Sequence, residues 1–367
     1  MLLLIIVPSH SNAQSVPADL TDLSLSELME ISVVEENAEI EQSDNWWNSS
    51  RLHVSYSFVH AEFNGFRNGT NNISDSALIG PANGVTYPIL QDAIIQEAHS
   101  FEFAMDVNEW MTAHIKVPYI LQSSGHHAIV GGPNFSDFTI RSEGFGDINM
   151  MGSFRMLRTQ AHSFALNIGV SLPTGSIREK GDTPSPGSRN QLPYTMQIGS
   201  GTWDVLLGAV YQGSTGPLAS TYTKPFGSFS WSLRVLGKIR TGRNSRGYRL
   251  GNRQISTVSV TAHPSPRFQP FIRLNTEISG KIRGTDDAFP GPIFPTPAAN
   301  PNNFGGEKIS LSGGTTIGFS AIPKGTVFDL LREHKISIEY GQPVYQSLNG
   351  PQAQERWHGS VNWSVDF

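Results

Sequence analysis

The sequence contains no cysteine, little charge and, after its first residues, no long apolar run. The absence of Cys among its 367 residues excludes disulfides, thiolate catalysis and cysteine-based metal sites. No apolar run beyond the amino-terminus approaches the roughly 18–20 residues of a membrane-spanning helix, so a helical membrane protein is excluded. Charged residues make up 16% of the chain and leave a net charge of -5, which is too small to favour nucleic acid as a partner.

The chain is instead rich in glycine, proline and aromatic residues. It contains 36 Gly and 23 Pro, and 10% of its residues are Phe, Trp or Tyr. Glycine and proline mark turns, and aromatic side chains favour strands. The composition therefore indicates an all-β protein in which many strands are joined by turns.

The last twelve residues, RWHGSVNWSVDF, alternate as a strand with one apolar face does. One face would present Trp357, Gly359, Val361, Trp363, Val365 and Phe367. The other face would present His358, Ser360, Asn362, Ser364 and Asp366. Side chains alternate across a strand, and about 9–11 tilted residues cross a bilayer. The segment resembles the closing strand of a bacterial outer-membrane β-barrel, and an edge strand of a soluble sandwich is the alternative.

The same two-residue period recurs from residue 51 onward. Apolar rows with polar residues between them include Leu52–Phe58, Phe101–Val107, Phe164–Leu172 and Phe229–Ile239. About twelve such rows occur, and an even number is expected of a single-chain bacterial barrel. Residues 51–367 are therefore predicted to form a transmembrane antiparallel up-and-down β-barrel of about 12 strands.

The connections between these rows alternate between long and mostly short. The long ones are predicted at residues 64–96, 122–144, 173–199, 241–252, 284–305 and 347–355. The short set is predicted at residues 108–109, 158–161 and 264–266, with longer members at 212–224 and 321–334. Long extracellular loops and short periplasmic turns produce this alternation in outer-membrane barrels, whereas a soluble sandwich has no reason for it.

The amino-terminus predicts export to the outer membrane of a Gram-negative bacterium. Leu2–Val7 is a short apolar run, and residues 11–13 (Ser-Asn-Ala) offer a small-residue cleavage site. Residues 1–13 are therefore interpreted as a signal peptide. Because the expected basic n-region is missing, the true start is expected to lie upstream.

Residues 14–50 differ from the strand-rich region that follows. Ser24 and Glu27 have the spacing of a capping box, which predicts a short periplasmic helix ahead of the barrel. The stretch DLTDLSLSELMEISVV (residues 19–34) resembles the start of the mature chain in TonB-dependent receptors. That resemblance implies a shared periplasmic docking element.

If the apolar rows face lipid, the polar rows line the lumen. The charged residues proposed to line it and to set its selectivity are Arg234, Lys238, Arg240, Arg273, Glu277, Lys281, Glu102 and Asp106. Because both signs occur, paired charges that brace the wall are one interpretation, and a polar path for water or a solute is the other. The residues predicted to anchor the barrel at the membrane interface are Trp110, Trp203, Trp231, Trp357, Trp363 and Phe367.

The sequence offers little catalytic chemistry. His263 and Ser265 are close in sequence but lie in a predicted turn, and a Ser/His hydrolase also needs a third, orienting group. His126 and His127 are adjacent, so in an extended segment their side chains diverge, which disfavours a metal site. We therefore expect no catalytic residues, no metal and no cofactor.

Four motifs rich in glycine and aromatic residues follow one another along the chain. They are Gly144–Ile148 (GFGDI), Leu172–Gly175 (LPTG), Gln197–Asp204 (QIGSGTWD) and Gly247–Gly251 (GYRLG). In their strand context they resemble the outer-membrane β-barrel family named for the meta-pathway of phenol degradation, whose members are described as transporters. The resemblance implies an outer-membrane barrel that passes small aromatic or otherwise hydrophobic compounds. Physically, the motif glycines permit bends and close approach at loop bases.

Together these features favour a porin-like outer-membrane channel or transporter for a small solute. The alternative is a non-transporting structural or scaffold barrel that docks a periplasmic partner. The expected partners are outer-membrane lipid and lipopolysaccharide, the barrel-assembly machinery through the C-terminal strand, and the solute. The arginines between Arg240 and Arg253 would face lipopolysaccharide phosphates or an anionic solute.

Overall fold

The computed structural model describes residues 52–79, 87–129, 135–184, 189–215, 227–319 and 331–367. The predicted signal peptide, periplasmic helix and TonB-like stretch lie outside these ranges. Within them, no helix has the length and apolar character needed to span a membrane. The helical elements there are short: α2 (Asp75–Ile79), η3 (Tyr194–Met196) and η5 (Pro297–Ala299).

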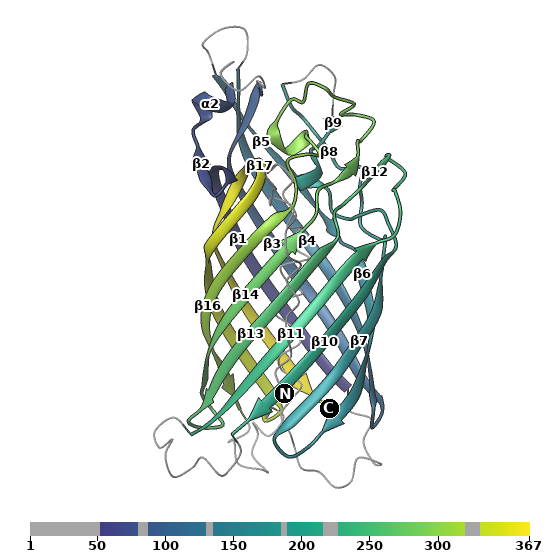
Figure 1. Ribbon diagram of the computed structural model, residues 1–367, viewed down its shortest axis with the longest axis vertical. Helices are drawn as coiled ribbons and strands as arrows, with labels where there is room; N and C mark the ends of the chain where they lie inside the picture. The colour runs from purple at the N-terminus through teal and green to yellow at the C-terminus, as the bar shows by residue number, and fades with distance from the viewer. Residues whose placement is uncertain (1–51, 80–86, 130–134, 185–188, 216–226, 320–330) are drawn as a thin grey trace, which may run out of the picture.

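The wall of the molecule is one closed antiparallel sheet. Its strands are β1 (Leu52–Gly69), β3 (Ile89–Asn108), β4 (Met111–Ile129), β6 (Ile148–Arg158), β7 (His162–Leu172), β10 (Asp204–Ser214), β11 (Ser228–Arg240), β13 (Arg253–His263), β14 (Gln269–Ser279), β16 (Gly306–Gly318) and β17 (His334–Asp366). Each pairs with its neighbour, and β17 pairs back with β1 (Figure 1). Closure leaves no unpaired sheet edge around the ring, and the predicted barrel fold is confirmed.

The long strand β17 supplies two segments of the wall. Its residues 335–348 pair with β16, and its residues 348–366 pair with β1. The two halves lie side by side: the rings of Tyr340 and Trp357 stack with centroids 5.9 Å apart, and Trp363 Nε1 lies 3.0 Å from His334 Nδ1. Of the 13-stranded sheet, β2 and β5 lie off the ring, so eleven strands close it. Because β17 counts twice, the ring has about twelve segments, as predicted.

Along the wall strands, most apolar side chains point outward and most polar side chains point inward, although an apolar cluster that includes Val59, Ile120 and Ile255 is buried on the inside. On β14, Leu274 and Ile278 are exposed, whereas Arg273 and Glu277 are buried. This arrangement is the reverse of a soluble protein, which buries its apolar side chains in one core. It suits a wall surrounded by hydrocarbon, in which lipid-facing and interior-facing residues alternate.

Several strand boundaries at the outer end of the barrel differ from those that the sequence predicts. Residues 64–69, 89–96 and 122–129 were predicted to be loop but lie in β1, β3 and β4, and residues 347–355 lie in β17. β5 (Phe135–Phe145) extends β4 as a hairpin, and β2 (Asn71–Ile73) pairs with the end of β1. These extensions stand above the rest of the wall (Figure 1). In these stretches apolar and polar residues do not alternate strictly, so they lack the two-residue period that predicts a strand.

Small paired elements occupy the outer connections. β8 (Lys180–Gly181) pairs with β9 (Asn190–Gln191), and β12 (Tyr248–Arg249) pairs with β15 (Arg283–Gly284). The β12–β15 pair joins the connection after β11 to the connection after β14. The short turns β3–β4 and β6–β7 lie at the opposite end, together with the C-terminus (Figure 1). That end is therefore the periplasmic one under the predicted orientation.

We expect the folded protein to migrate differently on a gel before and after boiling in SDS. Every wall segment is hydrogen-bonded on both sides, so mild detergent cannot open the ring strand by strand. Semi-native electrophoresis measures this difference. Identical mobility, together with solubility in detergent-free buffer, would contradict a membrane barrel.

The register of the closing strand gives a second prediction. Val361 is 40% exposed and faces outward, whereas Asn362 is 9% exposed and faces the interior. We expect Val361→Arg to lower the free energy of unfolding by ~2–4 kcal/mol near the bilayer midplane, and Asn362→Arg to lower it much less. Urea titrations of the protein refolded into lipid vesicles measure both values. Equal costs would show that the assigned faces of β17 are wrong.

Candidate functional site

The interior face of the wall is lined by polar and charged side chains. Six of the proposed lumen residues point inward and are buried: Glu102, Arg234, Lys238, Arg240, Arg273 and Glu277. Asp106 lies near the periplasmic end, where Arg155 Nη2 is 3.1 Å from its Oδ1. Lys281 lies two residues beyond the end of β14, in the outer connection. The proposed influence of these residues on selectivity stays a prediction.

Ion pairs connect these inward charges to one another. Arg240 Nη1 lies 2.6 Å from Asp204 Oδ2 across the β10–β11 pair. Arg273 of β14 forms an ion pair with Glu339 of β17. All four side chains are buried, and a buried charge without a partner is strongly destabilising. Two of the proposed selectivity residues are therefore each matched by a carboxylate in the wall.

A longer chain of charges crosses four wall strands near the outer end. Arg253 Nε lies 2.9 Å from Glu277 Oε1, and Lys308 Nζ lies 3.4 Å from Glu277 Oε2. Lys308 also pairs with Glu355, whose Oε1 lies 2.6 Å from His358 Nδ1. Positive and negative groups alternate along the chain, so it braces β13, β14, β16 and β17. The sequence missed it because Arg253 and Glu355 were assigned to, or next to, loops.

A second polar row crosses the opposite wall, where five inward residues face one another on successive strands. From β4 to β11 these residues are Lys116, Asn149, Ser171, Asp204 and Arg240. All five are buried. Polar side chains therefore face one another in register across β4, β6, β7, β10 and β11.

Three of the glycine-rich motifs meet just beyond this row. Asp147 of GFGDI accepts a hydrogen bond from Gly175 N of LPTG at 2.9 Å. It also accepts bonds from Ser200 N (2.9 Å) and Ser200 Oγ (2.6 Å) of QIGSGTWD. Burial raises the pKa of Asp147 above its ordinary value, while the bonds from Ser200 and Gly175 and the charge of Lys238 act in the opposite direction.

The glycines of these motifs let two outer connections touch. A Cβ atom on Gly199 would lie 2.5 Å from the carbonyl oxygen of Gly175, so any side chain there would force the backbones apart. Asn244 Nδ2 donates to Ser200 O at 3.0 Å and adds the connection after β11 to the group. The motifs thus hold loop bases together, which supports the structural interpretation of them.

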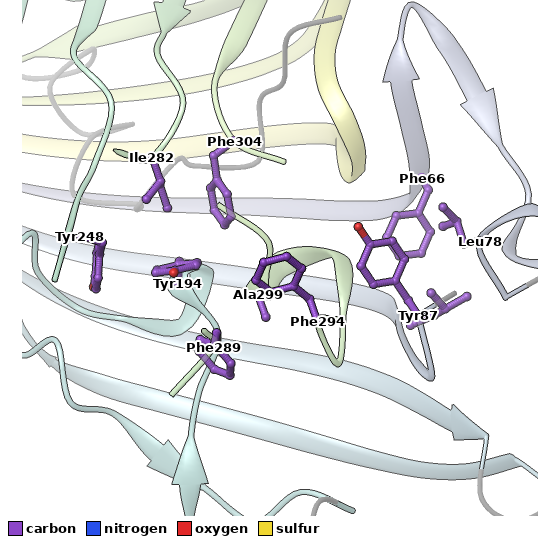
Figure 2. Packing of buried hydrophobic residues seen from close by; sticks show 11 residues of the cluster. Phe66, Leu78, Tyr87, Tyr194, Tyr248, Ile282, Phe289, Phe294, Ala299 and Phe304 are labelled. Carbon is purple, nitrogen blue, oxygen red and sulfur yellow. The ribbon is translucent and has the colours of Figure 1, made fainter. Parts of the chain in front are cut away.

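A hydrophobic cluster, here called the mouth cluster, lies among the outer connections (Figure 2). Its members are Phe66, Leu78, Tyr87, Leu90, Tyr194, Tyr248, Ile282, Phe289, Phe294, Ala299 and Phe304. The ring of Tyr194 lies 4.7 Å from that of Tyr248 and 5.4 Å from that of Phe304, centroid to centroid. Aromatic rings at such spacings stabilise one another beyond simple burial. The cluster therefore joins connections that are far apart in sequence.

The connection between β14 and β16 crosses the outer mouth of the barrel. Ile89 N at the start of β3 donates to Pro295 O at 3.0 Å, although three wall segments separate β16 from β3. On the other side, Asp286 N donates to Tyr194 Oη at 2.8 Å, in the β7–β10 connection. One connection thus contacts both sides of the ring.

The arginine-rich stretch is largely engaged within the protein. Arg246 forms a bidentate ion pair with buried Asp286. The hydrogen bonds from Arg246 to this carboxylate raise the pKa of Arg246 above its ordinary value. Arg249 Nη1 donates to Arg240 O at 3.2 Å. Arg243 is exposed. The expected contact with lipopolysaccharide phosphates stays a prediction.

The proposed interface anchors all lie on the outer surface. Trp110, Trp203 and Phe367 are each more than half exposed. Trp231, Trp357 and Trp363 are half-buried, and Trp357 Nε1 donates to Glu62 Oε2 at 3.0 Å. An amphipathic ring with a bonded N–H suits the boundary between lipid and water. Their role as membrane anchors stays a prediction.

One Ser–His contact was missed by the sequence. Ser230 Oγ lies 2.8 Å from His263 Nε2, and only the pairing of β11 with β13 brings the two residues together. A triad would need a third orienting group and donors for an oxyanion, so the pair alone does not define an active site. His126 and His127 have separate partners, Ser124 O and Asp92. In the described ranges, no three His, Asp or Glu side chains converge to hold a metal ion.

No protein-family model and no curated protein matches the sequence. Solved structures do match. An outer-membrane channel from Pseudomonas putida F1 has a TM-score of 0.54 and 11% identity, covering 87% of this chain and 96% of that one. The transport unit of the autotransporter AIDA-I from Escherichia coli has a TM-score of 0.44 and 9% identity, with 90% and 95% covered. A FadL homologue from Pseudomonas aeruginosa has a TM-score of 0.37 and 10% identity, with 86% and 89% covered.

The chain folds as an outer-membrane β-barrel. The first match exceeds a TM-score of 0.5, and the closed ring with its outward apolar rows agrees with it. At 11% identity the likeness establishes the fold and not the solute. The resemblance to the meta-pathway family therefore stays a prediction.

The contacts of Asp147 give a third prediction. We expect Asp147→Ala to leave the backbone N–H groups of Gly175 and Ser200 without an acceptor, which costs ~1–3 kcal/mol of local stability. Hydrogen exchange at the amides of Gly175 and Ser200 should then accelerate while the wall strands stay protected. The control is Asp182→Ala, because Asp182 is an exposed aspartate in the connection between β7 and β10 that also contains Gly175 and Ser200. Unchanged exchange at both amides would show that Asp147 does not hold these loop bases.

Proposed function

We propose that the protein is a channel or transporter through which a small solute crosses the outer membrane. The observation that supports it most directly is the polar interior face of a closed barrel, with inward rows such as Lys116–Asn149–Ser171. Charged and hydrogen-bonding groups along an interior surface offer a solute partners that lipid does not. In this proposal the protein is not an enzyme and needs no cofactor or metal.

An aromatic or otherwise hydrophobic solute is what the family resemblance implies. The mouth cluster places aromatic and aliphatic side chains around the connection that crosses the entrance. Because its members are buried against one another, the cluster fixes that connection in place, and the choice of such a solute comes from the resemblance. Lipopolysaccharide around the outer rim, and the barrel-assembly machinery during insertion, belong to the same proposal.

A non-transporting scaffold barrel is the second candidate. It is favoured by the pairing of Arg240 with Asp204 and of Arg273 with Glu339, because paired charges stiffen a wall without serving a solute. Such a barrel would dock a periplasmic partner through residues 14–50, which lie outside the described residues.

Planar-bilayer recording separates the two candidates. We expect the purified, heat-modifiable protein to give reproducible single-channel steps in KCl. The absence of any step from protein that is demonstrably folded would favour the scaffold. A mixture of leak and irregular steps without a reproducible size counts as absence.

Ion selectivity then tests the lumen charges. Arg273→Gln leaves Glu339 with an uncompensated charge, so we expect the reversal potential to shift toward cation preference. The shift should be modest, because water and salt screen charges beyond ~8–10 Å. The double variant Arg273→Gln with Glu339→Gln removes the pair as a whole and should restore the parent value. A conducting barrel whose selectivity moves in neither variant would show that this pair only braces the wall.

A further inference from the structure

Three polar residues form an in-register row on the interior wall. Thr257 of β13 lies directly opposite Asn275 of β14, and Asn275 lies directly opposite Ser310 of β16. Leu274 next to Asn275 points outward and is 40% exposed, so Asn275 points into the barrel. The three inward residues are 1%, 4% and 2% exposed.

Among the residues that the structure describes, the polar groups of this row have no hydrogen-bond partner. Thr257 Oγ1, Asn275 Oδ1, Asn275 Nδ2 and Ser310 Oγ are all buried and unbonded. Buried polar groups are almost always bonded, because an unbonded one loses its water without compensation. Three such residues side by side therefore indicate a shared partner supplied from the barrel interior.

The surroundings of the row favour a negatively charged partner. Arg234 lies next to Thr257 in the same row on β11, and Arg273 lies one inward position from Asn275 toward the periplasmic end, between Ser259 and Ser312. The nearest inward carboxylates are Glu339, paired with Arg273, and Glu277, paired with Arg253 and Lys308. Hydroxyls, an amide N–H₂ and guanidinium groups are donors that suit a carboxylate.

We propose that Thr257, Asn275 and Ser310 form a subsite that binds the carboxylate of a small organic anion on its way through the barrel. The inference deepens the proposed channel function and rests on it. The amide and the two hydroxyls hold the carboxylate oxygens, and the arginines beside the row stabilise the charge.

Binding is measured on the purified full chain in detergent micelles, with benzoate as the probe in a saturation-transfer NMR titration. Benzyl alcohol, which is neutral and of similar size, controls for partition into the micelle. Asn275→Leu removes the side-chain amide, with its oxygen and its N–H₂ group, at similar volume and should weaken benzoate binding about tenfold. Asn362→Leu makes the same exchange on β17 outside the row and should leave binding unchanged.

Equal binding of benzoate and benzyl alcohol would overturn the subsite, as would equal effects of the two leucine variants. If the Asn275→Leu variant does not fold, as judged by the loss of heat-modifiable mobility on a gel, the Ser310→Ala variant is used instead. Its benzoate affinity is expected to fall by about threefold. Single-channel recording in KCl tests the channel separately. If the barrel conducts but does not bind benzoate, the channel function is supported and the subsite is contradicted. If the barrel binds benzoate but never conducts, the subsite is supported and the channel function is contradicted.

Discussion

Inside a bilayer, a backbone N–H or C=O without a partner costs several kcal/mol, and no water is present to replace it. Every wall strand must therefore be bonded on both sides, and the pairing of β17 with β1 completes this requirement. Once the ring is closed, the period of two residues assigns each side chain to lipid or to the interior. The outward apolar rows and the inward polar rows both follow from this one constraint.

Closure of the ring also determines which interior charges lie next to one another. Residues far apart in sequence become direct neighbours across strands, as Arg273 and Glu339 do. In an interior of low dielectric constant, a lone charge is costly and a matched one is tolerated. The wall therefore contains chains of alternating sign rather than a field of one sign. Residues chosen from the sequence as selectivity determinants can for this reason be structural braces instead.

Much of the wall could be predicted from the sequence, because the lipid imposes a pattern on it. The alternation in Phe164–Leu172 or in the closing strand reflects contact with hydrocarbon on one face only. At the outer end the strict alternation is lost, so the sequence predicts loops where the outer parts of β3 and β4 lie. The partners of Asp147 and of Ser230 depend on register and on loop contacts. No local sequence pattern predicts the contacts of Asp147 or of Ser230.

The same reasoning separates the residues that hold the wall from those that can hold a solute. A side chain already bonded to a wall neighbour gains little by turning to a passing molecule, because it must first give up the existing bond. Arg240 with Asp204, and Asp147 with Ser200, belong to this group. Asn275 and Ser310 do not, since their polar atoms have no partner in the wall. Recognition within the described part of the barrel is therefore expected from its neutral polar residues, with the paired charges setting the background potential around them.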